Sequence, residues 1–136
     1  MLSLKSSYLL GRLAIGTSFF GHGLVRLPKL DKFSHGMIGE FRHSIMPEPL
    51  VLTFAYILPF AEFLVGLLLI LGLFTRQALV AGAVVMILLI FGCTTIENWS
   101  PIGEQLIHIL FLLGLLALVD SYDSWSLDKA LLRGHV

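Results

Sequence analysis

The sequence predicts an all-α integral membrane protein: an antiparallel bundle of four transmembrane helices, with an amphipathic helix at the membrane surface between spans one and two. Composition is the first reason. Of the 136 residues, 57% are hydrophobic and only 13% are charged, whereas about a quarter of the residues of a soluble domain are charged. The mean hydropathy is +0.91. The second reason is that four long apolar segments follow one another along the chain.

These apolar segments have the lengths that membrane-spanning helices need. A hydrocarbon core about 30 Å thick requires roughly 20 helical residues. The expected spans cover approximately residues 8–26, 50–74, 77–96 and 103–119. They occupy more than half of the chain, so residues 1–136 are predicted to form a single transmembrane domain.

The first span and the connection after it differ from the rest in carrying many polar residues. Arg12 and His22 interrupt the first apolar run, which favours a transmembrane helix over a cleaved signal peptide. Pro28 is expected to end this helix, because the residue before a proline avoids the helical conformation. The long connection up to Pro49 has apolar residues three or four positions apart, which favours a helix on the membrane surface. These positions are Leu27, Leu30, Phe33, Met37, Ile38 and Phe41.

Short turns at residues 75–77 and 97–103 link the remaining spans. With four spans, both termini and the first of these turns lie on one side of the membrane. That side carries five basic residues and the other carries four, so the excess of Lys and Arg in cytoplasmic loops places both termini in the cytoplasm. The five are Lys5, Arg12, Arg76, Lys129 and Arg133, and the four are Arg26, Lys29, Lys32 and Arg42.

Charge and cysteine content exclude several functions. Nine Lys and Arg are balanced by nine Asp and Glu, so the chain has no basic surface for nucleic acid. The single cysteine, Cys93, excludes an internal disulfide and any zinc or iron–sulfur site built from several cysteines. The sequence shows no electron carrier of its own.

Polar residues inside membrane spans are costly and often functional. Six of them form pairs four residues apart, each pair on one helix face: His22 with Arg26, Cys93 with Glu97, and Glu104 with His108. The antiparallel order places all six in the half of the bilayer near the long connection. Glu62, three residues after Pro59, reaches the middle of the second span from the same side. We therefore expect a polar pocket that opens toward the long connection, whose helix forms a lid and supplies His35 and His43.

The residues of this pocket suggest two roles. We expect catalytic proton transfer from Glu62, Glu104 and His108, and ligand binding by His22, Arg26, Glu97 and Cys93. The alternative for Glu62 is a structural ion pair with Arg26. Haem ligation by His22 and His108 is less favoured, because histidines near helix ends are more often structural. No metal site is expected, since the Glu-x-x-His pairs of di-iron bundles do not occur here.

Several motifs in order also resemble those of one membrane family. They are Arg12, Gly23 with the basic segment 26–30, the segment from Glu62 that ends Gly-Leu-Phe-Thr-Arg76, and Ser126-Leu127-Asp128. In these motifs the chain resembles the DoxX family of small four-helix membrane proteins, which includes the DoxD-type small subunit of thiosulfate:quinone oxidoreductase. The resemblance implies a bacterial inner-membrane protein with cytoplasmic termini. It also implies association with a redox system, in some members at the quinone pool.

Three functions compete at this point, and the sequence leaves open whether the chain is an enzyme. The first is a redox-associated membrane subunit that binds a quinone or similar amphipathic ligand in the polar pocket and receives electrons from a partner protein. The second is a non-catalytic subunit that assembles or anchors a membrane complex. The third is a small transporter, which would require a homo-oligomer because four short helices enclose little space.

Overall fold

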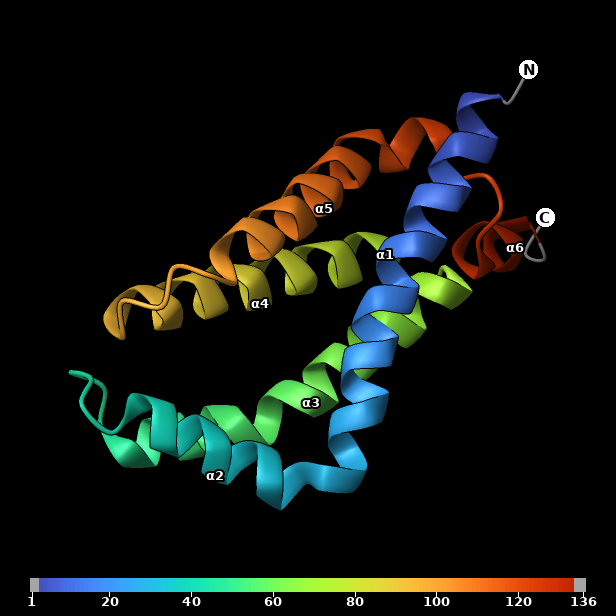
Figure 1. The fold of residues 1–136 in the computed structure, drawn as a ribbon. Helices are drawn as coiled ribbons and strands as arrows, with labels where there is room; N and C mark the ends of the chain where they lie inside the picture. The colour runs from blue at the N-terminus through green and yellow to red at the C-terminus, as the bar shows by residue number, and fades with distance from the viewer. Residues whose placement is uncertain (1–2, 134–136) are drawn as a thin grey trace.

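The computed structural model describes residues 3–133, which form four long helices and two short ones. The long helices are α1 (Leu4–Arg26), α3 (Glu48–Leu71), α4 (Thr75–Thr95) and α5 (Ile102–Tyr122). The short ones are α2 (Leu30–Phe41) and α6 (Leu127–Arg133), and a 3₁₀ turn over Leu27–Lys29 joins α1 to α2. Successive long helices run in opposite directions (Figure 1). The predicted antiparallel four-helix arrangement is therefore confirmed, and α1 ends at Arg26, shortly before Pro28 as expected.

Three of the long helices are long and apolar enough to cross a membrane: α3, α4 and the helix that begins at Ile102. Helix α1 is not among them, and polar residues such as Arg12, Ser18 and His22 reduce its hydropathy. Its most extensive contacts are with α3, a helix apolar enough to span. The chain is thus a multi-pass membrane protein in which the most polar long helix packs against a more apolar one.

Glycines bring the backbones of α1 and α3 into direct contact. A Cβ atom at Gly66 would overlap the backbone nitrogen of Phe20 and would lie 2.7 Å from the carbonyl oxygen of Gly16. Further along the crossing, a Cβ atom at Gly23 would overlap the backbone nitrogen of Phe63. Small residues allow such close approach between membrane helices. The contact fixes how far α1 is shifted and rotated along α3, and so determines which side chains of the two helices meet.

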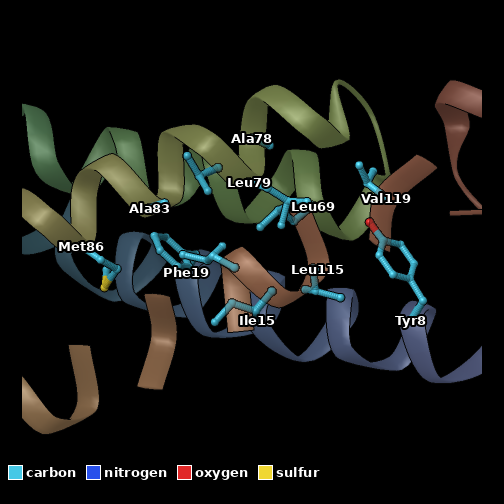
Figure 2. Close-up of a cluster of buried hydrophobic side chains, with 12 residues drawn as sticks. Tyr8, Ile15, Phe19, Leu69, Ala78, Leu79, Ala83, Met86, Leu115 and Val119 are labelled. Atoms are coloured by element: carbon cyan, nitrogen blue, oxygen red, sulfur yellow. The ribbon is translucent and has the colours of Figure 1, made fainter. Parts of the chain in front are cut away.

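The hydrophobic core lies where the four long helices come together (Figure 2). Its members include Ile15 and Phe19 of α1, Val65 and Leu69 of α3, Leu79 and Met86 of α4, and Leu112 and Leu115 of α5. Leu69, Leu79 and Leu112 have no exposed surface. Because every long helix contributes, the core ties the pair α1–α3 to the pair α4–α5.

A buried ion pair joins the start of α1 to the end of α5. The Arg12 Nη1 atom lies 2.9 Å from Asp123 Oδ1, and the two side chains are 2% and 4% exposed. Arg12 also donates a hydrogen bond of 2.6 Å from Nη2 to the carbonyl oxygen of Trp125. The arginine in the first span is therefore neutralised inside the protein and is shielded from lipid.

The turn between α3 and α4 is held by the segment that follows α5. Gly72 ends α3 with a left-handed backbone at φ 67°, and its carbonyl oxygen accepts a hydrogen bond of 3.0 Å from the Asp128 amide. The Asp128 carboxylate accepts hydrogen bonds of 2.8 Å from the amides of Phe74 and Thr75. A carboxylate is favourable there because the first amides of a helix are unpaired and carry positive partial charge.

At the opposite end of the bundle, α2 packs along the first half of α3 (Figure 1). The Tyr56 hydroxyl of α3 donates a hydrogen bond of 2.9 Å to Asp31 of α2. The Arg26 guanidinium lies 4.8 Å from the centre of the Phe33 ring, within the range of a cation–π contact. The apolar spacing of the long connection thus does form a helix, and this helix is attached to both α1 and α3.

The close crossing of α1 and α3 generates the first prediction. The Gly66→Ala change should lower the free energy of unfolding by at least ~1–3 kcal/mol, the usual cost of overpacking, because the new methyl group would meet backbone that cannot rotate away. Thermal unfolding in detergent, followed by circular dichroism, measures this. Gly114→Ala is the matched control, since nothing lies within 4 Å of a Cβ atom there. Equal unfolding temperatures for the two variants would contradict the prediction.

Candidate ligand-binding site

A small hollow of about 140 Å³ lies among the long helices at the end of the bundle that faces α2. We call it the polar hollow. It is lined by five of the seven residues that the sequence assigned to a site: His22, Arg26, Glu62, Glu104 and His108. Three helices, α1, α3 and α5, supply these residues. Five of the seven side chains expected to converge therefore lie around one hollow.

Arg26 and Glu62 form an ion pair at the wall of the polar hollow. The Arg26 Nη1 atom lies 2.7 Å from Glu62 Oε1 and 2.6 Å from Oε2. The Glu62 side chain is 4% exposed, whereas that of Arg26 is 28% exposed and reaches the opening. The close approach at Gly23, three residues before Arg26, brings the arginine to α3. The structure thus contains the ion pair that was the alternative interpretation of Glu62, and it places that pair beside the hollow.

Two histidines face each other across the polar hollow. The ring centres of His22 and His108 are 6.3 Å apart and the rings are nearly perpendicular. Each ring bonds through Nδ1 to the backbone carbonyl four residues earlier, at 2.7 Å for His22 and 2.8 Å for His108. The second ring nitrogen of His108 lies 2.8 Å from the Ser18 hydroxyl. Both rings are therefore oriented by their own helices, with Nε2 directed away from the helix backbone.

A larger hollow of about 550 Å³ adjoins the polar one. We call it the apolar hollow. On one side it is bounded by α2 and the start of α3, and on the other by the end of α4 and the start of α5. These two pairs of segments diverge from each other in Figure 1. Its walls include Phe33, Met37, Phe54, Leu88, Phe91 and Cys93. The two hollows share Arg26, Leu89, Pro101 and Gln105, so a polar compartment and an apolar compartment meet at a common wall.

Comparison with known proteins agrees with this architecture. The sequence model of the DoxX family matches residues 7–95, about two thirds of the chain. The chain belongs to the DoxX family. No curated protein and no solved structure matches it.

The region matched by the DoxX model contains only part of the site. Helices α1 to α4 lie almost wholly within the matched region, which includes His22, Arg26 and Glu62. Helix α5, which supplies Glu104 and His108, lies beyond it. The matched region therefore includes the ion-pair wall of the polar hollow, and the opposite wall comes from the last third of this chain.

Two sequence expectations about this DoxX chain need correction. Glu97 does not line either hollow: α4 ends at Thr95, and Glu97 lies in the following turn with a left-handed backbone at φ 54°. The four-residue spacing from Cys93 therefore does not place the two on one helix face.

His35 and His43 were expected to reach the pocket from its lid, but both are exposed and neither lines a hollow. Helix α2 turns its apolar face inward instead, with Phe33 and Met37.

Two residues with clear roles in the hollows were not singled out from the sequence. Ser18 donates to His108 across the interface of α1 and α5, and it lies one helical turn before His22. Gln105 lines both hollows, and its Nε2 atom lies 3.5 Å from Cys93 Sγ. The Gln105 Oε1 atom is buried without a partner among the residues that the structure describes. The available signals were the position of Gln105 directly after Glu104 and that of Ser18 one helical turn before His22.

The residues described do not suggest a metal centre. Within 3–133, no group of three or more His, Cys, Asp or Glu side chains is arranged to hold a metal ion. The polar hollow offers instead a guanidinium, a paired carboxylate, two imidazoles and an amide. These are groups that form hydrogen bonds with a small polar head.

The ion pair leads to a second prediction. Arg26→Met should lower the free energy of unfolding by ~3–5 kcal/mol, because it leaves the buried Glu62 carboxylate unpaired. The double variant Arg26→Met/Glu62→Gln should recover most of that loss, since no buried charge remains. Thermal or denaturant unfolding of the purified variants measures both effects.

The control is Arg76→Met, which removes an arginine from the solvent-exposed ion pair with Asp120 and should change stability little. A double variant no more stable than Arg26→Met alone would show that Glu62 is not held by this arginine.

Proposed function

We propose that this DoxX protein is a redox-associated membrane subunit that binds a quinone, or a similar amphipathic ligand, and works with a partner protein that donates electrons. One observation carries the proposal: the polar hollow and the apolar hollow meet at the shared wall of Arg26, Leu89, Pro101 and Gln105. A quinone has the same division into a polar ring head and an apolar tail. The apolar hollow, at about 550 Å³, falls within the ~300–1,000 Å³ usual for small-molecule sites.

In this proposal the residues of the polar hollow hold the head of the ligand. Arg26 has N–H groups beyond those that contact Glu62, and these can donate to a ring oxygen. Gln105 brings to the same wall a buried oxygen that has no partner within residues 3–133. Quinone chemistry supplies a two-electron, two-proton couple, and the proposal assigns the handling of these protons to Glu62, Glu104 and His108, which line the polar hollow.

The apolar hollow receives the tail. Its walls come from α2 and α3 on one side and from α4 on the other, and Cys93 is one of the smaller wall residues. The proposal places the chain in a bacterial inner membrane with both termini in the cytoplasm. In this proposal the electrons come from a protein partner.

One observation favours the alternative, a non-catalytic subunit that assembles or anchors a complex. The Glu62 carboxylate already has a close cationic partner in Arg26, as a residue that only specifies helix packing would. The alternatives differ in what Glu62→Gln does in the isolated complex: a proton-handling role requires slower turnover, whereas a packing role requires lower stability with normal turnover.

The third prediction tests ligand binding directly. A ubiquinone analogue with a ten-carbon tail should bind the purified protein in nanodiscs, measured by isothermal titration calorimetry against empty nanodiscs. Cys93→Phe places a large side chain in the wall of the apolar hollow and should weaken binding at least about tenfold, or ~1.4 kcal/mol.

Val84→Phe is the matched control, because Val84 also lies on α4 but is 49% exposed and lines neither hollow. It should bind as the unaltered protein does. Binding that is unaffected by Cys93→Phe, or equally weakened by both changes, would place the ligand elsewhere.

A further inference from the structure

We infer that the polar hollow selects the hydroquinone form of its ligand over the quinone form, an inference that rests on the proposed function. The two forms differ in hydrogen bonding. A quinone presents two carbonyl oxygens, which only accept hydrogen bonds, whereas a hydroquinone presents two hydroxyl groups, which also donate them. The form that binds better therefore depends on whether the free positions of the hollow are donors or acceptors.

The backbone decides which nitrogen of each histidine carries its proton. His22 Nδ1 lies 2.7 Å from the carbonyl oxygen of Ser18, and His108 Nδ1 lies 2.8 Å from that of Glu104. A carbonyl oxygen has no proton, so in both rings Nδ1 must be the donor. In a neutral imidazole the other nitrogen, Nε2, is then an acceptor.

The two Nε2 atoms differ in whether they already have a hydrogen-bond partner. The Nε2 atom of His108 lies 2.8 Å from the Ser18 hydroxyl, so this hydroxyl is the donor to the neutral ring. The Nε2 atom of His22 has no hydrogen-bond partner among residues 3–133. His22 therefore brings one free acceptor to the polar hollow.

Other free positions in the hollow are also acceptors. Gln105 Oε1 is buried without a partner among the described residues. Glu104 lines the hollow with a carboxylate, and its only hydrogen bond to another side chain in the described part of the chain is through its backbone oxygen. On the donor side, the Ser18 hydroxyl is already bonded to His108. Arg26, the one cation in the lining, contacts Glu62 through Nη1 only and keeps further N–H groups.

The free positions therefore include acceptors as well as the remaining N–H groups of Arg26. A hydroxyl group can bond to both kinds, whereas a carbonyl oxygen can bond only to donors. Gln105 Oε1 is the buried acceptor of the set, and because leaving it without a donor costs free energy, this cost falls on the quinone form. His22 and Glu104 are exposed side chains and add a smaller preference. Tighter binding of the reduced form also raises the two-electron potential of the bound ligand, by ~30 mV for each tenfold preference. The site would then favour the arrival of electrons on its ligand.

The test compares the two forms of one probe, the ubiquinone analogue with a ten-carbon tail and its chemically reduced hydroquinone. Affinities are measured for the protein in nanodiscs by calorimetry under argon at pH 8. The hydroquinone should bind at least about fivefold more tightly than the quinone. Gln105→Met removes the buried acceptor and should reduce this ratio most, and His22→Phe, which removes an exposed free acceptor, should reduce it as well.

His35→Phe is the matched control. His35 has the same Nδ1 contact, 2.7 Å from the carbonyl oxygen of Asp31 four residues earlier, but it lines neither hollow. The ratio of hydroquinone affinity to quinone affinity in this variant should equal that of the unaltered protein. If both forms bind equally, or the quinone binds better, the inference is overturned while the proposed function stands. If neither form binds, the proposed function fails first. A ratio unchanged by both His22→Phe and Gln105→Met would also overturn the inference.

Discussion

The direct backbone contact between α1 and α3 is the constraint on which the rest of the molecule depends. Gly66 lies against Phe20, and Gly23 lies against Phe63, with no room for a side chain at either glycine. This contact brings the most polar long helix against an apolar one. It also places Arg26, at the last residue of α1, beside the Glu62 carboxylate. The wall of the polar hollow is thus a consequence of helix packing, and a single methyl group at the crossing would disturb both.

The two ends of the bundle use buried charge for different purposes. At the end that contains the start of α1, Arg12 is surrounded by Asp123 and a backbone carbonyl, and both ionic side chains are fully buried. At the other end, Arg26 is partly exposed and lies where the two hollows meet. A closed pair serves only to hold helices together, whereas a pair at an opening can also meet a ligand. This difference is why we place function at the α2 end.

The sequence was sufficient for the helix order and for most of the polar hollow. Apolar segments of membrane-spanning length predicted four antiparallel helices, and the antiparallel order then placed His22, Glu62 and His108 at one depth. It failed where helical spacing was extended past the end of a helix: α4 stops at Thr95, so the four-residue spacing from Cys93 does not bring Glu97 onto the same face. Spacing alone also could not show which face of α2 turns inward, because that depends on its packing against α3.

The apolar hollow could not be predicted from the sequence at all. It exists because α2 and the start of α3 diverge from α4 and α5, and this depends on the angle between helix pairs, which a hydropathy pattern does not contain. The motifs that resemble those of DoxX proteins also acquire separate explanations. The Gly-Leu-Phe-Thr-Arg turn and Asp128 form one structural contact, and Glu62 belongs to the site.

The central claim is that an amphipathic ligand occupies the two adjoining hollows, with its tail in the apolar one. The most direct measurement is photo-crosslinking in nanodiscs with a quinone whose tail carries an azide, followed by mass spectrometry of the labelled peptides. The account predicts label on α2 and on the end of α4, around Phe33, Met37 and Cys93, and its loss when unlabelled quinone is added in excess. Label confined to exposed positions such as Val84 and Leu110, and unaffected by competitor, would contradict it.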